Sequence, residues 1–380
     1  MSGDGLALVT HSTSPRGGML HTMALAEALH AAGRPVHLVT QGERLHRPLA
    51  VPHTVLPAPD RSGTLSDRVF ASIDALAGAL SGLAGEFSVL HAQDCIAARA
   101  AARVRDAGAP VSVVRTVHHV DDFTTPALVH CQRAAIEEPD RVLVVSRQWR
   151  RILRDEYGVD ADVVPNGVDT TRFAPVTPRR RSSLRASVGA DDRFLFLSVG
   201  GIEPRKGTRF AFEALARMDP RPVLAVVGGH SFQDYAAYRE ETLAALPSLG
   251  LELGRDVILL GTLSEQDLGD WYGSADALVF PSVKEGWGLA VLEAMAAGLP
   301  VVASDLPVFH EYLTDGRNAL LPAVADPEAL AAAMTAVAGD ELLRGRLRAG
   351  GRATVPRFTW ERSARRHLEI YDELTTAAVG

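Results

Sequence analysis

The sequence predicts an α/β protein made of two doubly wound domains, each with a parallel sheet and helices on both faces. A chain of 380 residues is longer than a domain with a single hydrophobic core usually is, which favours two domains. Short β-branched apolar runs alternate with helical stretches, as in parallel α/β sheets. A polar segment interrupts this alternation once, after which it begins afresh, so the same kind of domain is expected twice.

The first domain is predicted over residues 1–172 and opens with a βαβ unit. A strand at Leu6–Thr10 precedes a loop, a helix from about Met19 to Ala31, and a second strand at Val36–Thr40. Later apolar runs extend this sheet at Val111–Val117, Arg141–Ser146 and Asp162–Pro165.

The second domain is predicted over residues 190–358, after a stretch near Thr170–Ala190 that is polar and rich in turn-forming residues. Residues 359–380 are expected to form an amphipathic helix with Leu368, Tyr371 and Leu374 near one stripe. The strands of the second domain are expected at Phe194–Gly200, Val223–Gly229, Val257–Gly261, Ala277–Pro281 and Val301–Ser304.

Composition narrows the class of protein. With 47% hydrophobic and 22% charged residues the chain is of ordinary globular type, and a net charge of −7 argues against general nucleic-acid binding. Cys95 and Cys131 form neither a disulfide framework nor a metal-ligand spacing, which suits a reducing cytoplasm. The N-terminus lacks the pattern of a secretion signal, and no run of about 18 apolar residues suggests a membrane span. We therefore expect a cytoplasmic protein.

Doubly wound sheets bind ligands outside the carboxyl ends of their strands, and two such domains most simply face each other across a cleft. The loop at Ser14–His21 joins a strand to a helix, where Gly17 and Gly18 would let backbone N–H groups approach an anion; the plain alternative is a tight turn. His118 closes another strand and could donate a hydrogen bond to a ligand, although many such histidines are simply satisfied near-surface groups.

Two cations follow a strand of the second domain. The loop Gly200–Gly207 brings Arg205 and Lys206 to the start of a helix. Cations are unfavourable beside a helix N-terminus, so a bound anion would stabilise them there. Alternatively, both side chains reach into solvent. Asp160 and Asp162 have a D-x-D spacing but precede a strand, so we interpret them as a solvated turn and expect no metal.

Glu293 is the one ionisable residue between Glu285 and Asp305. It lies within an apolar stretch that predicts a helix from about Leu289 to Ala297, preceded by turn residues Gly286 and Gly288. A buried carboxylate is costly without a partner, and this stretch supplies none. Because Glu293 lies on this helix and Glu285 in the loop before its first turn, both carboxylates could reach one cleft beside the helix N-terminus.

Together these motifs resemble the retaining GT-B glycosyltransferases of glycosyltransferase family 4, over nearly the whole chain. The strongest is the E-x7-E spacing from Glu285 to Glu293 within a frame of glycine and alanine. The others are Gly17, Gly18 and His21, where the histidine comes one residue earlier than in the family's GGxxxH pattern, TVHH at Thr116–His119, VVPNGVD at Val163–Asp169, and PRKG at Pro204–Gly207.

The resemblance implies the GT-B arrangement of the two domains, with the C-terminal helix crossing back to the N-terminal one. It implies a nucleotide-sugar donor in the C-terminal domain and an acceptor mostly in the N-terminal domain. His118, Lys206 and Glu285 are its candidate catalytic residues: His118 near the reaction centre, Lys206 on the diphosphate, and Glu285 beside the transferred sugar. Its candidate donor-binding residues are Gly17, Gly18, Gly201, Arg205, Lys206, Glu285, Gly286, Gly288, Leu289 and Glu293, with Glu293 holding the ribose hydroxyls.

The chain departs from the family at Gly201, where an arginine is usual within G-R-x4-K. Losing one of two cations at a developing diphosphate should matter for catalysis. Arg205 could substitute, although that position of the motif is normally variable.

The resemblance implies metal-independent transfer of a sugar, with retention, from a nucleoside diphosphate to an acceptor hydroxyl, with a UDP-sugar favoured. The nucleotide sugar is a co-substrate, and no cofactor is expected. Rival functions are a nucleotide-sugar epimerase, a phosphorylase on the same scaffold, and a non-catalytic nucleotide-sugar-binding protein. The acceptor would be a small or lipid-linked molecule. A peripheral membrane contact through Arg179–Arg181 is conceivable, but a short basic run in a polar linker is more often solvated.

Overall fold

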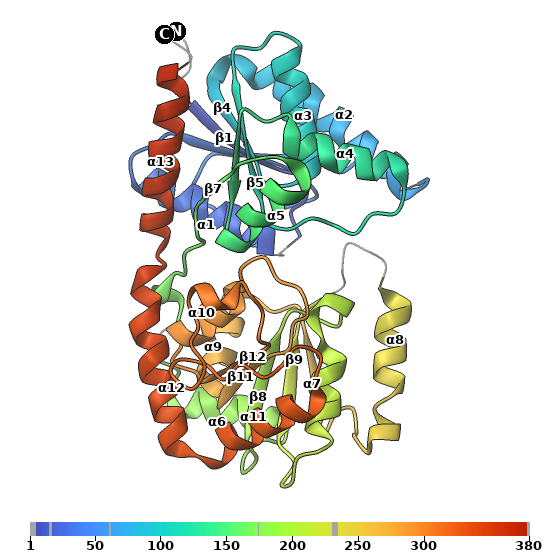
Figure 1. Ribbon diagram of the computed structural model, residues 1–380, viewed down its shortest axis with the longest axis vertical. Helices are drawn as coiled ribbons and strands as arrows, with labels where there is room; N and C mark the ends of the chain where they lie inside the picture. Colours follow the sequence, from blue (N-terminus) through green and yellow to red (C-terminus); the bar gives the residue numbers. More distant parts are fainter. Residues whose placement is uncertain (1–4, 15–16, 61, 174, 230–234, 378–380) are drawn as a thin grey trace. The chain divides into compact units, whose positions relative to one another are not determined.

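The computed structural model of the chain describes residues 5–14, 17–60, 62–173, 175–229 and 235–377 (Figure 1). It consists of two compact units. The first contains the chain up to Gly167 together with the segment from Thr359 onward, and the second contains Val168–Phe358. Residues 168–189, which the sequence analysis leaves largely between two domains, thus belong to the second unit.

The first unit is built on a seven-stranded sheet of order β3-β2-β1-β4-β5-β6-β7, in which every neighbouring pair is parallel. Parallel neighbours need crossover connections, and the helices between the strands provide them. The strands are β1 (Gly5–Thr10), β2 (Val36–Gln41), β3 (His53–Leu56), β4 (Phe87–Ala92), β5 (Ser112–Val117), β6 (Arg141–Val144) and β7 (Asp162–Val163).

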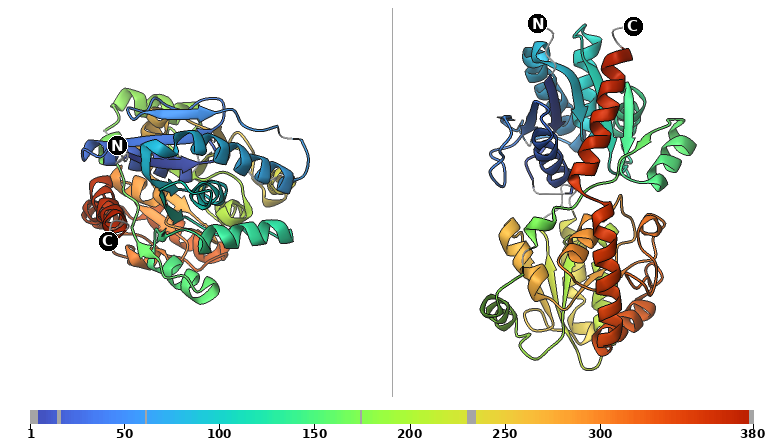
Figure 2. Two further views of the ribbon diagram at one scale, coloured as in Figure 1. Left: turned by 90° about the horizontal axis from the view of Figure 1, so that it is seen from above. Right: turned by 90° about the vertical axis from the view of Figure 1, so that its left-hand side faces the viewer.

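Helices cover both faces of this sheet. Ala7 and Val9 of β1 belong to the core formed with α2, α3 and α4, so the alternating Leu6 and Leu8, also buried, point to the opposite face. On that side α1 packs on β1 and β2 and against α13 (Figure 2). The helices are α1 (Gly17–Ala31), α2 (Leu65–Leu83), α3 (Cys95–Asp106), α4 (Pro126–Glu137), α5 (Arg147–Tyr157) and α13 (Trp360–Ala377).

Within the described ranges, one helical segment, Leu65–Glu86, is long and apolar enough by length and composition to cross a membrane, with a mean hydropathy of 1.2. The expectation from the sequence that no such run exists does not hold for this segment. Val69, Ile73, Leu76 and Leu80 are buried in the core of the first unit, which accounts for the apolar face of this helix.

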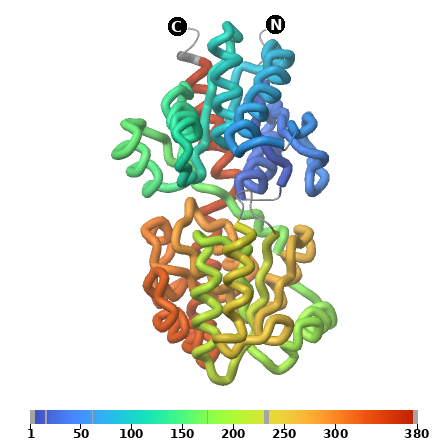
Figure 3. Tube along the Cα trace, turned by 90° about the vertical axis from the view of Figure 1, so that its right-hand side faces the viewer, coloured from blue at the N-terminus to red at the C-terminus, as the bar shows by residue number. Residues whose placement is uncertain are grey.

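The second unit repeats the plan with a five-stranded parallel sheet of order β10-β9-β8-β11-β12. The Cα trace shows its chain alternating between strands and helices (Figure 3). The strands are β8 (Leu195–Val199), β9 (Val223–Val227), β10 (Val257–Gly261), β11 (Ala277–Phe280) and β12 (Val301–Ala303), and the helices are α6 (Pro178–Ser187), α7 (Thr208–Leu215), α8 (Ala236–Ala244), α9 (Glu265–Ser274), α10 (Leu289–Ala296), α11 (Pro327–Gly339) and α12 (Glu341–Thr354).

The structure confirms the two doubly wound domains and the return of the C-terminal helix to the first of them. All the strands expected from the sequence are present, but β3 and β4 were missed. The buried stripe of α13 was assigned imprecisely. Tyr371 is buried as expected, while Leu368 and Leu374 are only partly buried, and His367 and Ile370 take their place in the stripe.

The basic run at Arg179–Arg181 lies on a helix, so the interpretation as a polar linker is wrong. Helix α6 packs against α9. Arg180 pairs with Asp267 and Asp270 of α9, and Arg181 pairs with Asp276. Intramolecular partners therefore occupy two of the three arginines.

Candidate functional site

The loops that follow β8 and β11 meet because these two strands are neighbours in the second sheet. The amide of Val283, after β11, donates to the carbonyl of Arg205 at 2.8 Å. Gly207 has φ 62°, and a Cβ placed there would lie 2.0 Å from the carbonyl oxygen of Pro281. Only glycine fits a left-handed position so close to another backbone, which explains the glycine that ends PRKG.

Lys206 and Glu285 form a buried ion pair at this junction. The Lys206 Nζ lies 2.6 Å from Glu285 Oε1, and the two side chains are 13% and 8% exposed. The ammonium group also lies 4.9 Å from the centre of the Phe280 ring. The hydroxyl of Ser282 donates to the same carboxylate oxygen at 3.0 Å. The structure thus brings together two predicted catalytic residues from separate loops.

The two members of this pair are shifted in pKa by the same surroundings. Burial lowers the pKa of Lys206, although Glu285 opposes that change. Burial alone would raise the pKa of Glu285, but the charges of Lys206 and Arg205 and the hydrogen bonds from Lys206 and Ser282 outweigh it, so the pKa is lowered. Glu285 is ionised at neutral pH.

Arg205 lies at the edge of this cluster. Its guanidinium is 3.1 Å from Glu203 and 3.6 Å from Glu285, and its side chain is 44% exposed. Its positive charge can therefore stabilise an anion bound beside Lys206. Its side chain is less buried than that of Lys206 and lies farther from Glu285.

Gly200 and Gly201 serve the packing of the loop itself. Both amides donate to the carbonyl of Val227, at 2.8 and 3.0 Å. The carbonyl of Gly201 accepts from the hydroxyl of Thr208. Gly201 has φ 74°, and Lys206 folds across Gly200, where a Cβ would meet the lysine Cε at 2.8 Å. The backbone groups of Gly201 are thus engaged within the protein, and an arginine there would need a strained backbone.

Glu293 lies on α10 and has a different set of neighbours. Its Oε2 accepts a hydrogen bond of 2.9 Å from the hydroxyl of Tyr272 on α9, and Arg172 Nη1 lies 4.0 Å from Oε1. The residue is 8% exposed, and burial raises the pKa of its carboxyl despite these two neighbours. Tyr272 and Arg172 were not predicted as neighbours of Glu293. Glu285 and Glu293 belong to separate networks rather than to one contact.

The remaining predicted donor-binding residues of this unit lie on the loop into α10. Gly286 lies between Glu285 and Trp287, and Leu289 is the first residue of α10. Gly288 precedes the helix with φ 88°, and a Cβ there would meet the ring of Phe309 at 2.6 Å. Glycine at 288 is therefore required by packing.

In the first unit, His118 and His21 lie together at the carboxyl edge of the sheet. Their ring centroids are 4.5 Å apart, edge to face. The amide oxygen of Gln93 lies 3.1 Å from His118 Nε2, and that of Asn166, from the VVPNGVD motif, lies 2.8 Å from His21 Nδ1. Burial is the main cause that lowers the pKa of both rings, to about 3 for His21 and well below its usual value for His118. Both rings are neutral at pH 7.

The same edge carries Asp94, a residue that the sequence analysis did not single out. Its carboxylate caps α3 through the amide of Ala97 and accepts from the hydroxyl of Thr10 and the amide of His11. The His11 ring lies 3.0 Å away. Burial would raise the pKa of Asp94, but His11, the amide of Ala97 and the charge of Arg115 lower it far below its usual range.

Gly17 and Gly18 are the first two residues of α1. A Cβ at either would meet no other atom within 4 Å, so the packing of the described residues does not demand glycine at these positions. Open space at a helix N-terminus is compatible with the predicted approach of an anion. Ser14 is described, whereas residues 15 and 16 of the same loop lie outside the described ranges.

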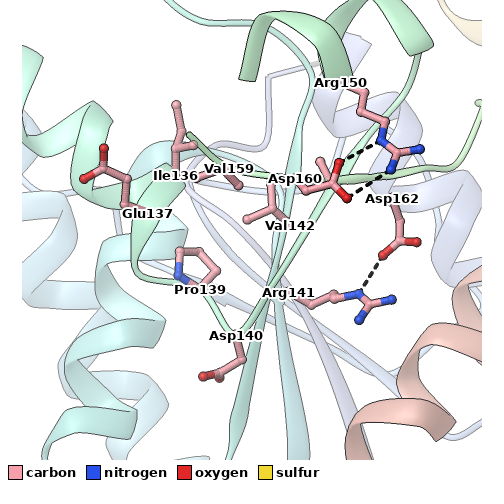
Figure 4. A pocket seen from close by; sticks show the side chains of 11 residues that line it. Ile136, Glu137, Pro139, Asp140, Arg141, Val142, Arg150, Val159, Asp160 and Asp162 are labelled. Atoms are coloured by element: carbon pink, nitrogen blue, oxygen red, sulfur yellow. Dashed lines mark hydrogen bonds and ion pairs between the residues drawn. The ribbon is translucent and has the colours of Figure 1, made fainter. Parts of the chain in front are cut away.

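A hollow of about 350 Å³ lies elsewhere in the first unit, at the amino ends of β6 and β7 (Figure 4). Four of its charged side chains pair with one another: Arg141 with Asp162 at 2.6 Å and Arg150 with Asp160 at 2.9 Å. Because doubly wound sheets bind ligands at the carboxyl edge, this hollow is not the candidate site. The part of the chain that the structure describes holds no cluster of three or more histidine, cysteine, aspartate or glutamate side chains suited to a metal ion.

Two doubly wound, parallel-sheet domains in one chain are the architecture of the GT-B class of fold. Comparison with known proteins supports the same class. Residues 15–172 match the model of "Glycosyltransferase Family 4" and residues 180–354 that of "Glycosyl transferases group 1". A sucrose-phosphate synthase from Thermosynechococcus elongatus has the same fold, with a TM-score of 0.83 at 23% identity over 98% of this chain and all of that one. The Anabaena protein HepE in complex with UDP-glucose gives 0.81 at 19% identity, over 97% and 99% of the two chains.

Sequence relatives make the assignment more specific. A D-inositol 3-phosphate glycosyltransferase of Frankia alni is 34% identical over 323 residues, which is 78% of this chain and 76% of that protein. The enzyme of the same name from Xylanimonas cellulosilytica is 32% identical over 252 residues, 64% of this chain and only 59% of the relative's length. The chain belongs to glycosyltransferase family 4.

Proposed function

We propose that the protein is a retaining glycosyltransferase that moves a sugar from a nucleoside diphosphate to an acceptor hydroxyl. The observation that carries this proposal is the buried pair of Lys206 and Glu285, with Arg205 at its edge, where the loops after β8 and β11 meet. Such a cluster can bind a diphosphate and stabilise the charge that develops as it leaves. Family membership supports the same assignment.

In the proposed reaction the bond between the anomeric carbon and the phosphate oxygen breaks, and the acceptor oxygen bonds to the same face of that carbon. The proton of the acceptor hydroxyl passes to the departing phosphate. Lys206 and Arg205 stabilise the negative charge of the diphosphate, which is why we propose a reaction independent of metal ions. Since Glu285 holds Lys206 in the free protein, the diphosphate would share this lysine or take it over, leaving Glu285 beside the transferred sugar.

Glu293 would bind the ribose through its hydroxyl groups, which are neutral donors that suit a buried carboxylate. His118 would lie near the reaction centre as a neutral hydrogen-bonding group, since burial keeps its ring uncharged at pH 7. Arg205 would supply part of the charge that an arginine at position 201 provides in the family.

We propose a UDP-sugar as donor and a small phosphorylated polyol as acceptor. The donor proposal draws on the structural likeness to a protein bound to UDP-glucose, and the acceptor proposal on relatives named D-inositol 3-phosphate glycosyltransferases. A lipid-linked acceptor is the alternative that the same assay distinguishes.

The test begins with a thermal-shift screen of the full chain against UDP-, ADP- and GDP-sugars, because a ligand that binds only the folded state raises its apparent stability. Donors that bind are then incubated with inositol phosphates or with lipid-linked sugars, and the products are examined by mass spectrometry and NMR. The expected product is a glycosylated acceptor with the anomeric configuration of the donor, formed also in excess EDTA. An epimerised donor, phosphorolysis, or binding without turnover would refute the proposal.

A further inference from the structure

The carboxylate of Glu293 is held by a side chain from a neighbouring helix. The hydroxyl of Tyr272, on α9, donates to Oε2 at 2.9 Å. Tyr272 is fully buried, and its ring contacts Phe173 edge to face, with the centroids 5.5 Å apart. A phenol held in this way cannot turn aside without disturbing the packing around it, so its oxygen stays beside Glu293, which is a nearer acceptor than the carbonyl of Ala290 at 3.4 Å.

Arg172 approaches the other side of the same carboxylate. Its Nη1 is 4.0 Å from Glu293 Oε1, beyond hydrogen-bond distance, and its Nη2 is 3.6 Å from Glu265, the first residue of α9. Arg172 thus favours the ionised carboxylate through its charge without occupying Oε1. The groups that face Glu293 are Tyr272 and Glu265 from α9 and Arg172 from the segment that follows the VVPNGVD motif.

We propose that Tyr272 is the positioning residue for nucleotide binding: its phenol fixes Oε2 of Glu293 and thereby presents Oε1 to the ribose hydroxyls. This inference rests on the proposed function, in which Glu293 binds the ribose. A glutamate has several rotatable bonds, and fixing it before the ligand arrives reduces the entropy that binding would otherwise cost. The same bond helps to keep a carboxylate that is 8% exposed in its charged form.

The experiment measures nucleotide affinity by isothermal titration calorimetry on the full chain at pH 7.5. UDP, ADP and GDP are each compared with the corresponding 2′,3′-dideoxynucleotide, which lacks both ribose hydroxyls. Tyr272→Phe should weaken the preferred nucleotide roughly tenfold, as expected when a charged group loses one hydrogen bond. It should leave the affinity for the dideoxynucleotide unchanged, because that ligand makes no use of Glu293.

Tyr371→Phe is the matched control. It also removes a buried phenol hydroxyl, one that lies 2.7 Å from His91 in the first unit. It should change the affinity for neither nucleotide. The ratio of the two affinities is measured within each variant, so a general loss of stability cancels.

Two further readouts distinguish positioning from a merely structural role. In a Tyr272→Phe/Glu293→Gln double variant, affinity should fall no further than in Glu293→Gln alone, since Tyr272 acts through Glu293. The effect of Tyr272→Phe should also grow as the pH falls from 8 to 6, because the carboxyl that lost its donor is protonated at a higher pH than before.

The inference is overturned if Tyr272→Phe binds the nucleotide as the unmodified protein does, or if it weakens the dideoxynucleotide equally. It is also overturned if the two substitutions add in the double variant. Failure of the unmodified protein to bind any of the three nucleotides would instead refute the proposed function, and this inference with it.

Discussion

Replacing Glu285 by glutamine should destabilise the second unit, because it leaves a buried ammonium group without its anion. The pair is short, at 2.6 Å, and both side chains are largely buried. Removing one member of a buried ion pair typically costs about 3–5 kcal/mol. Glutamine can still accept a hydrogen bond, and Lys206 retains the face of Phe280, so we expect about 2–3 kcal/mol. For a unit of this size that loss lowers its Tm by roughly 4–12 °C.

Lys206→Met should cost less, about 1 kcal/mol, because Glu285 keeps Ser282 and the nearby Arg205. The double variant should resemble Lys206→Met alone, since a neutral pair no longer buries an unpartnered charge. The assay is differential scanning calorimetry of the full chain and the three variants at pH 7.5. A saturating nucleoside diphosphate should raise the Tm of Glu285→Gln more than that of the unmodified protein, because its phosphates supply the missing anion.

The decisive outcome is the interaction between the two substitutions. If the double variant loses the sum of the two single losses, Lys206 and Glu285 do not stabilise each other and the reasoning fails. If Glu285→Gln is no less stable than the unmodified protein, the desolvation cost of the pair has been misjudged.

Three other changes have expected outcomes. Glu293→Gln should raise the Tm of the free protein, because the raised pKa of this carboxyl means that its ionised form destabilises the fold at neutral pH. The same substitution should weaken nucleotide binding. Calorimetry with and without nucleotide checks both outcomes. The first unit should lose stability as the pH falls from 6.5 towards 4, because His21 and His367 have pKa values lowered to about 3 and about 4 in the folded protein and the unfolded chain therefore takes up protons first. Urea titrations across this range measure the loss. His367→Gln should reduce the dependence of the unfolding free energy on pH. Gly207→Ala should lower the Tm strongly, because the added Cβ would lie 2.0 Å from the carbonyl oxygen of Pro281 at φ 62°, whereas Gly158→Ala, at φ 70° with open space around it, should cost only about 1–2 kcal/mol.

The fold could be predicted because buried parallel strands leave a local signal. Strands such as Leu195–Val199 are covered on both faces and are therefore almost wholly apolar. The two missed strands lack that signal. β3 (His53–Leu56) is an edge strand with no fully buried residue, and β4 (Phe87–Ala92) carries Ser88 and His91. Both strands are defined by their pairing in the structure, β3 with β2 and β4 with β1.

The proximity of the candidate site residues could be predicted where they lie on loops that follow neighbouring strands. Lys206 and Glu285 each follow a strand end, and the sheet order then places them together. Tyr272 could not be predicted, because a tyrosine on a mostly polar helix suggests ordinary packing and its contact with Glu293 depends on how α9 meets α10. Arg172 follows a recognisable motif, but nothing in the sequence shows which carboxylate it approaches.

Glu285 and Glu293 show why the surroundings decide what a carboxylate can do. Burial by itself would raise the pKa of both carboxyl groups. The net shift is nevertheless downward for Glu285 and upward for Glu293. Glu285 is paired with a cation, so in the proposed reaction an incoming diphosphate would compete with it for Lys206. Glu293 has one hydroxyl donor and a more distant guanidinium, so neutral hydroxyl groups can complete its hydrogen bonds. In the proposed reaction the first carboxylate would therefore share or lose its partner as the donor binds, whereas the second would gain one. Substitution of Glu285 should accordingly lower both turnover and the stability of the free protein. Substitution of Glu293 should lower turnover but raise the stability of the free protein.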